Sequence, residues 1–221
     1  MHHADLRPSQ PATAAAAGST AAEATDATRE RTYSWDDPAI TAAAAREQDG
    51  ASFLQALLEG TLPGAPIART LDFRPASVQP GVVAFEFTPA EFHYNPIGSV
   101  HGGMIATLCD SACGCAVQSM LPAGTHYTSL DLTVKFLRPV TAATGPMKCE
   151  ATVTHLGGRS ALAQASLTDA HGKLYAHATS SCMIFRPPAA TPPAPTPYAG
   201  DHPFSRLTRC GQRPEALPSR R

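Results

Sequence analysis

The sequence lacks the features of several broad functional classes. Its 17 Lys and Arg residues nearly balance 18 Asp and Glu residues, which leaves a formal net charge of −1 at pH 7. A chain without excess positive charge lacks the electrostatic footprint of nucleic-acid-binding proteins and of polybasic membrane surfaces. No run approaches the roughly 18 consecutive apolar residues that a membrane-spanning helix needs. We therefore expect neither a nucleic-acid partner nor a membrane partner.

The chain start and the cysteines indicate a cytoplasmic protein. The opening residues Met-His-His-Ala-Asp form neither a basic nor an apolar segment, so we expect no secretory signal. The six cysteines are scattered along the chain, and we expect free thiols in a reducing compartment. Cys109, Cys113 and Cys115 share one short stretch, but no further Cys or His pair follows at metal-ligand spacing, so no metal site is expected.

Composition divides the chain into a globular middle and two tails. Residues 1–35 are rich in Ala, Thr, Ser and Pro and nearly lack large apolar groups. Such a segment cannot bury enough surface to offset the entropy of ordering, so we expect it to be disordered. Residues 187–221 repeat proline at short intervals and end in an Arg-rich stretch, which is typical of an extended tail. One domain remains, over residues 36–186.

Hydrophobic periodicity within this domain predicts an α+β fold. A helical pattern starts at Asp36-Asp37-Pro38 and runs to about Glu59, with an interruption near Gly50. A long helix over about 102–120 is apolar nearly all round, so it needs cover on every side. One antiparallel sheet of about six strands can cover only part of it, and we expect a partner subunit to cover the rest. The expected strands are 71–73, 82–87, 130–136, 146–155, 160–168 and 174–185.

A dense group of glycines and polar residues leads into the long helix. Residues 95–103 read Asn-Pro-Ile-Gly-Ser-Val-His-Gly-Gly. Backbone N–H groups at a helix start lack partners, and Gly102 and Gly103 let a substrate oxygen approach them closely. Such groups can polarise a carbonyl and hold a developing oxyanion. The glycines alone, however, favour a plain turn in which they relieve strain.

Asp110 strengthens the functional interpretation, because it is the only charged residue of the apolar helix. A buried carboxylate is costly unless it is hydrogen-bonded, metal-bound or functional. The structural alternative is a bond to a backbone group or to the hydroxyl of Thr107 or Ser111. Asp110 and the glycine-rich loop together therefore predict a catalytic site.

The spacing of Gly102 and Asp110 along the helix predicts that two copies of the chain assemble. Eight residues of helix separate them by about 12 Å along the axis. A base and an oxyanion donor must each lie within roughly 3 Å of their target atoms, so the two cannot serve one substrate from one chain. An antiparallel pairing about a two-fold axis brings Gly102 of one subunit near Asp110 of the other. We therefore expect a homodimer with composite active sites.

The spacing Asn-x-x-Gly-x-x-His-Gly-Gly, with Asp nine residues after the His, resembles the PaaI-type branch of the hotdog-fold thioesterases. The stretches at 128–132, 136–139 and 157–160 resemble the strand and hairpin that follow the helix in that family. The resemblance covers about residues 51–186. It implies a hotdog fold, with a long central helix wrapped by an antiparallel sheet, and hydrolysis of an acyl-CoA thioester. It also implies a dimer of dimers and no cofactor beyond the coenzyme A of the substrate.

The resemblance assigns roles to the residues around the helix start. Asp110 would be the general base or the nucleophile, and the Gly102 N–H would polarise the thioester carbonyl. Asn95 would position the water or the carbonyl, and His101 would orient the loop and the thioester. Gly103 would contact the substrate.

The resemblance also assigns roles on the strands. Ser129 would hold the attacking water, with Thr128 as a rival for that position. Arg159, with Ser160 beside it, would meet the phosphates of coenzyme A. Arg138 would do the same, although an ion pair at the strand end explains it equally well.

Other interpretations stay open. A non-catalytic acyl-CoA-binding protein would bind ligand without releasing product. A hotdog hydratase or dehydratase uses a different His and acid arrangement, which the His-Gly-Gly-x6-Asp pattern disfavours. Aromatic, medium-chain and long-chain acyl groups are all compatible with the sequence. His93 is close enough to the loop to line its entrance, although a packing role is the plainer interpretation.

Overall fold

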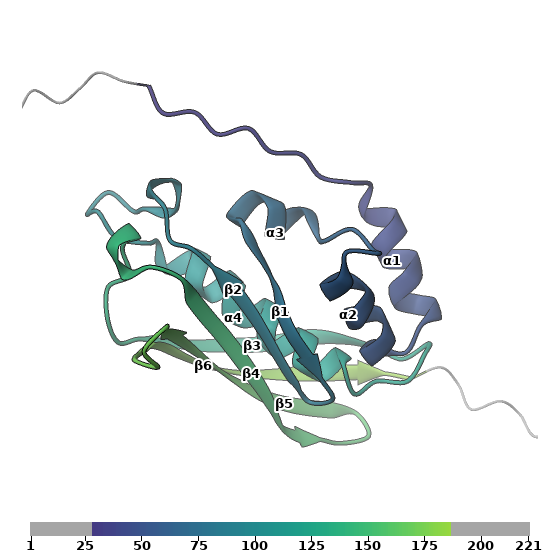
Figure 1. The fold of residues 1–221 in the computed structure, drawn as a ribbon. Helices are drawn as coiled ribbons and strands as arrows, with labels where there is room; N and C mark the ends of the chain where they lie inside the picture. Colours follow the sequence, from purple (N-terminus) through teal and green to yellow (C-terminus); the bar gives the residue numbers. More distant parts are fainter. Residues whose placement is uncertain (1–27, 187–221) are drawn as a thin grey trace, which may run out of the picture.

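A six-stranded antiparallel sheet curls around one long helix in the computed structural model of the chain, which describes residues 28–186 (Figure 1). The strand order β1-β2-β4-β5-β6-β3 leaves β1 and β3 at the two edges. The predicted α+β class, the antiparallel sheet and the long central helix are confirmed. The strands are β1 (Phe73–Gln79), β2 (Val82–Phe87), β3 (His126–Phe136), β4 (Met147–Leu156), β5 (Ser160–Asp169) and β6 (Leu174–Phe185).

The central helix α4 (Gly102–Gln118) packs one face against the concave side of the sheet. Small side chains on both sides allow this close approach. Fully buried Cys109, Ala112 and Cys113 on the helix belong to one core with an alanine-rich inner sheet face. At Gly114 a Cβ atom would lie 2.3 Å from the Tyr127 hydroxyl oxygen, so only glycine fits there.

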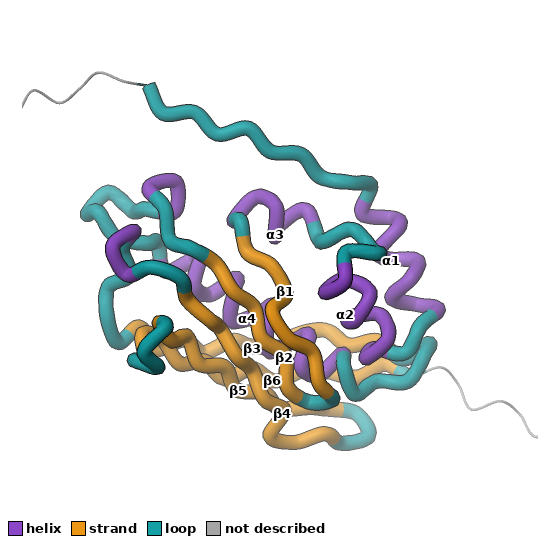
Figure 2. The backbone as a smooth tube through the Cα atoms, viewed as in Figure 1, coloured by secondary structure: helices purple, strands orange, loops and turns teal. Residues whose placement is uncertain are grey.

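Three short helices gather beside the β1 edge of the sheet (Figure 2). Asp37 caps α1 (Pro38–Glu47), and Asp49 caps α2 (Gly50–Glu59) by accepting the Ser52 N–H at 3.0 Å. Gly50 donates its N–H to the Leu121 carbonyl at 2.9 Å. A Cβ there would overlap the Gln118 carbonyl, so glycine is required where α2 meets the end of α4.

The structure differs from the sequence-based prediction between residues 66 and 79. The expected strand at 71–73 has wrong bounds, because Leu71 ends a third helix, α3 (Pro66–Leu71), and the strand starts only at Phe73. Pro66 suits the first turn of a helix, and Asp72 ends it in the left-handed region with φ of 54°. Strand β1 then begins at Phe73 and carries Pro75 beside a bulge, which an edge strand tolerates.

The two expected tails fall largely outside the described residues, which exclude 1–27 and 187–221. Residues 28–35, which composition assigns to the N-terminal tail, lie extended over the domain on the α3 side (Figure 1). Among residues 28–186, no helix is long and apolar enough to cross a membrane.

Candidate active site

The loop before α4 is closed by the amide side chain of Asn95. Its Oδ1 accepts the N–H groups of Ile97 at 3.0 Å and Ser99 at 3.3 Å, and its Nδ2 donates to the Ser99 hydroxyl at 3.1 Å. Gly98, with φ of 82°, makes the reversal possible. The Asn95 oxygen is therefore engaged in shaping the loop, and its second amide hydrogen is what remains to meet a ligand.

His101 is the N-cap of α4 and fixes the geometry of the helix start. Its Nδ1 accepts the Gly103 N–H at 2.8 Å, so the proton of the neutral ring is on Nε2. Gly103 thus uses its N–H within the chain, which weakens the expectation that it contacts the substrate. Among residues 28–186, the Gly102 N–H has no hydrogen-bond acceptor, and it is the group of this turn that remains available to an incoming oxygen.

A cavity of about 340 Å³ opens beside Gly102. The Phe136 ring lies against this residue, and a Cβ on Gly102 would come within 3.1 Å of the Phe136 Cζ atom. Sequence reasoning missed Phe136, whose signal is its position as the last apolar residue of a clean period-two strand. The cavity is lined by Asn95, Ser99, Val100, Gly102, Ile105, Phe136, Leu137, Arg138, Pro139 and Val140.

Asp110 and Ser129 meet although 19 residues separate them in the sequence. The Ser129 hydroxyl donates to Asp110 Oδ1 at 3.0 Å. A bulge in β3 after Ser129, where Leu130 is the extra residue, interrupts the pairing with β6. Tyr127 and Ser129 both face the helix, so Thr128 points to the opposite face of the sheet. The geometry therefore favours Ser129 over Thr128 as the hydroxyl beside Asp110.

The premise that Asp110 is buried is wrong for the single chain. The residue is exposed, as are His101 and Gly103, while Thr107 and Ser111 on the same helix are half-buried. Within the described part of the chain, the sheet covers the core face of α4 and leaves Asp110 exposed on the polar face. The Thr107 hydroxyl donates to the Gly103 carbonyl rather than to Asp110.

Two cysteines near Asp110, Cys113 and Cys115, are poor candidates for chemistry. Burial raises the pKa of the Cys113 and Cys115 thiols to about 12, with the charge of Asp110 adding to the effect. The thiols therefore stay neutral at physiological pH and are weak nucleophiles. The five cysteines among residues 28–186 are unpaired, and Cys210 lies outside the described residues.

The two predicted arginines lie at opposite ends of β3. Arg159 is exposed in the β4–β5 turn, and Ser160 next to it pairs with Met183, whose other neighbour is Thr128. This places Arg159 at the Ser129 end of the strand. Arg138 follows the other end, lines the cavity beside Gly102, and donates to the Leu174 carbonyl. Among residues 28–186 it forms no ion pair, so the expected strand-end ion pair is wrong.

His93 does not line the entrance of the loop. Its side chain is 3% exposed, its Nε2 lies 2.8 Å from the Leu71 carbonyl, and its Nδ1 accepts the Ala90 N–H at 3.0 Å. Burial lowers the pKa of His93, and the nearby Arg31 charge acts in the same direction. His93 therefore has a structural role: it is buried and hydrogen-bonded, and it packs against the loop before α4.

The candidate residues therefore form two separate groups on one chain. The first, which we call the loop group, consists of Asn95, His101, Gly102 and Arg138 around the cavity. The second, the carboxylate group, consists of Asp110 and Ser129, with Arg159 at the same end of the sheet.

Comparisons with known proteins show which families and folds this chain resembles. Residues 97–176 match the family model of the thioesterase superfamily. A Halobacterium salinarum protein with the provisional name of an esterase is 40% identical over 72 residues, which are 32% of this chain and 46% of that protein. The chain thus spans about half the length of this curated relative.

Solved structures share the fold. A Ralstonia eutropha JMP134 protein, provisionally named a thioesterase and related to phenylacetic acid degradation, is 29% identical with a TM-score of 0.54, covering 59% of this chain and 98% of that one. The PaaI protein of E. coli, from the phenylacetic acid degradation operon, is 21% identical with a TM-score of 0.54, covering 61% and 95%. Residues 97–176 of the chain thus match the thioesterase superfamily, and its hotdog domain is similar to the PaaI-type branch.

Proposed function

We propose that the protein hydrolyses an acyl-CoA thioester to a free carboxylic acid and coenzyme A. The observation that carries the proposal is the hydrogen bond of 3.0 Å between Ser129 and Asp110 on an uncovered face of α4. A carboxylate held in this way can act on a substrate that reaches the same face. The match of residues 97–176 to the thioesterase superfamily supports a thioester as the bond that is attacked.

The chemistry requires a nucleophile and an oxyanion donor. Asp110 either takes a proton from water, which attacks the thioester carbon, or attacks that carbon itself to form an anhydride that water then cleaves. The Ser129 hydroxyl donates to Asp110 and keeps its lone pairs for the water. The Gly102 N–H donates a hydrogen bond to the carbonyl oxygen and stabilises the negative charge that develops there. The C–S bond breaks, and the thiolate takes up a proton to leave as coenzyme A.

Each site in this proposal combines two chains. Gly102 and Asp110 are separated by eight residues of one helix, about 12 Å, so the two groups cannot reach one carbonyl together. A second copy, paired antiparallel along α4 and the edge strand β3, brings the loop group of one chain to the carboxylate group of the other. The β3 edge supports this partner, since no strand among residues 28–186 pairs with it and it exposes Leu130 and Phe136. Two such dimers would then associate into a tetramer.

Arg159 and Arg138 complete the proposal as phosphate-binding residues for coenzyme A. Arg159 is exposed beside the carboxylate group, and Arg138 lies at the rim of the cavity in the loop group. Planar guanidinium groups suit phosphate oxygens geometrically. Arg159 belongs to the carboxylate-group end of the sheet and Arg138 to the loop group. Both can therefore contact one coenzyme A molecule only when the two groups come from paired chains.

The test is release of free thiol from a panel of aromatic, medium-chain and long-chain acyl-CoAs. We expect wild type to turn over at least one of them and Asp110→Asn to lose about a hundredfold or more in kcat, as loss of a general base would cause. The matched control is Asp131→Asn, because this carboxylate of β3 bonds Ser181 on the outer face of the sheet, and its loss should leave the rate unchanged.

Two outcomes would contradict the proposal. Binding of acyl-CoA by wild type without any thiol release would favour a non-catalytic binding protein instead. Equal losses in the Asp110→Asn and Asp131→Asn variants would show that the carboxylate group has no specific role.

A further inference from the structure

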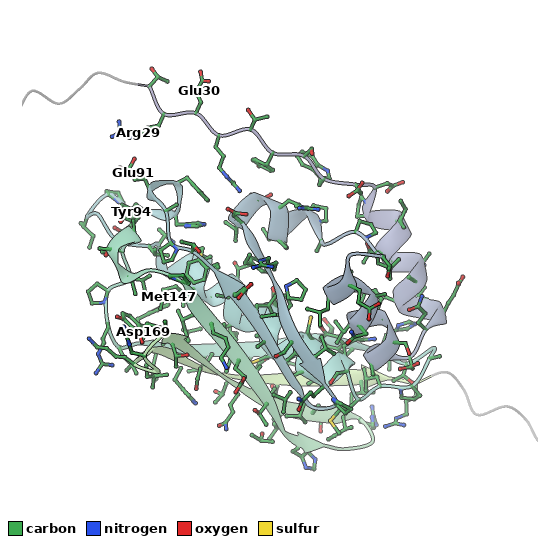
Figure 3. The ribbon with its side chains drawn as sticks, viewed as in Figure 1. Arg29, Glu30, Glu91, Tyr94, Met147 and Asp169 are labelled. Carbon is green, nitrogen blue, oxygen red and sulfur yellow. The ribbon has the colours of Figure 1, made fainter. Side chains whose placement is uncertain are left out.

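The segment ahead of α1 is attached to the domain by specific contacts. Arg31 donates from Nη1 to the Thr70 carbonyl at 2.6 Å and from Nη2 to the Arg69 carbonyl at 2.9 Å. Arg29 pairs with Glu91 at 2.6 Å, which brings the segment to the short helix η1 (Glu91–His93) (Figure 3). Arg31 is half-buried, whereas the rest of residues 28–36 is exposed. The segment is therefore held mainly through Arg31.

Arg31 shares its binding site with His93. The carbonyls at a helix C-terminus lack partners within the helix, and those of the last turn of α3 are free to accept other donors. Arg31 binds two of them, and His93 donates from Nε2 to the next one, Leu71, at 2.8 Å. Because His93 Nδ1 accepts the Ala90 N–H, the ring carries its proton on Nε2. Three consecutive carbonyls are thus bound by two side chains from distant segments.

Phe92 links these two side chains. The Arg31 Cζ atom lies 4.0 Å from the centroid of the Phe92 ring, and the Phe92 and His93 ring centroids are 4.1 Å apart. A guanidinium over an aromatic face is attracted to it. The N-terminal segment therefore packs on η1 as well as on α3.

Backbone contacts within residues 93–101 connect His93 to the start of α4. The His93 carbonyl accepts the His101 N–H at 2.7 Å, and Tyr94 and Val100 form an isolated antiparallel bridge. His101 is the N-cap of α4, and the peptide group that follows it carries the Gly102 N–H. A continuous series of contacts thus runs from Arg31 to the proposed oxyanion donor.

We propose that Arg31 and His93 are positioning residues, which hold the Gly102 N–H in its reactive direction through η1 and the N-cap. This inference rests on the proposed function. Neither side chain touches the proposed carbonyl site, so both act through the backbone of residues 93–101. Loosening this support should misplace the oxyanion donor, which lowers kcat and leaves KM nearly unchanged.

The experiment uses full-length Arg31→Ala with Arg46→Ala as the matched control. Arg46 is exposed on α1, and its side chain forms no hydrogen bond or ion pair among residues 28–186. We expect Arg31→Ala to lower kcat about tenfold with KM changed less than about twofold, since small misplacements at a reacting centre are costly. Arg31→Lys should lie between the two, because an ammonium group cannot bind both carbonyls as a fork does.

A second measurement, backbone hydrogen exchange, does not depend on catalysis. The His101 amide should exchange faster in Arg31→Ala than in wild type, whereas Arg46→Ala should match wild type. Exchange and kcat that are the same in both variants would overturn the positioning role, as would a change in KM alone. Absence of thiol release from wild type would instead overturn the proposed function, while the exchange result would still test the support.

Discussion

The loop group and the carboxylate group are built by different means, although both belong to one proposed site. Asn95, Ser99 and His101 shape the loop through bonds to residues no more than five positions away, apart from the support that His93 gives from below. Asp110 and Ser129 meet only because β3 packs along α4 and bulges at the right residue. Apart from Arg138, the first group is a product of local sequence, and the second is a product of the tertiary fold.

The two groups also differ in how complete they are within one chain. The loop group has a lined cavity of about 340 Å³ and rests on buried Val100 and His93. The carboxylate group lies open on the uncovered face of α4. An open carboxylate without an oxyanion donor can bind water but cannot by itself stabilise a tetrahedral intermediate. A lined cavity in one group and an open carboxylate in the other are what we expect of a site that is divided between two subunits.

The largest effect among variants of the loop group should come from Gly102→Pro. Proline suits the first position of a helix, and the extended backbone of His101 (φ −62°, ψ 133°) suits a following proline, so the helix start should survive while its N–H is lost. Loss of one oxyanion donor lowers kcat by about a hundredfold to a thousandfold.

Gly102→Ala is the matched control for this change. It adds the same Cβ, 3.1 Å from the Phe136 ring, but keeps the N–H. The kcat ratio between the proline and alanine variants therefore isolates the donor. A ratio near one would show that the Gly102 N–H has no part in catalysis.

A smaller effect is expected for Ser129→Ala in the carboxylate group. The change removes the hydroxyl that donates to Asp110, and we expect kcat to fall about tenfold, less than for loss of the base itself. Thr128→Ala on the opposite face of the strand should leave kcat unchanged. If the two variants were equally impaired, the assignment of Ser129 rather than Thr128 would fail.

The smallest expected effect is on the free energy of unfolding, through the buried His93 that packs against the loop group. Burial lowers the pKa of His93 below its ordinary value of 6.5, so the unfolded chain binds more protons than the folded chain in mildly acid solution. The contribution of neutral His93 is complete above about pH 6.5 and is lost as the pH falls from there towards the lowered pKa. Urea unfolding at several pH values would measure this loss.

His93→Gln should weaken the fold at neutral pH but flatten its pH dependence below about pH 6.5, because the titrating group is gone. His126→Gln, at an exposed histidine of β3, should retain the pH dependence of wild type. An unchanged slope in His93→Gln would show that another group is responsible.

The sequence predicts much of the fold because its signals are local. Period-two alternation and turn residues place β4, β5 and β6 nearly at their observed bounds, and the apolar run after Gly102 predicts α4. Helix α3 was missed because six residues are too few to show a helical period. The motif also predicts Asn95, His101 and Gly102 of the loop group, since the bonds that shape this loop connect residues close in sequence.

Other features depend on tertiary contacts that no local pattern encodes. The choice of Ser129 over Thr128 depends on the bulge in β3, which sets which side chain faces the helix. The exposure of Asp110 depends on how far one sheet can wrap around α4. The docking of Arg31 requires the position of α3, which periodicity did not reveal.

The most direct test of the divided site is complementation between two inactive chains. Asp110→Asn and Gly102→Pro would be co-expressed with different affinity tags, and thiol release would be measured on complexes that contain both. Each mixed dimer should hold one site with native Asp110 and native Gly102, so a purified mixed dimer should recover about half of the wild-type rate. Mixed complexes as inactive as either parent would contradict a site shared between subunits.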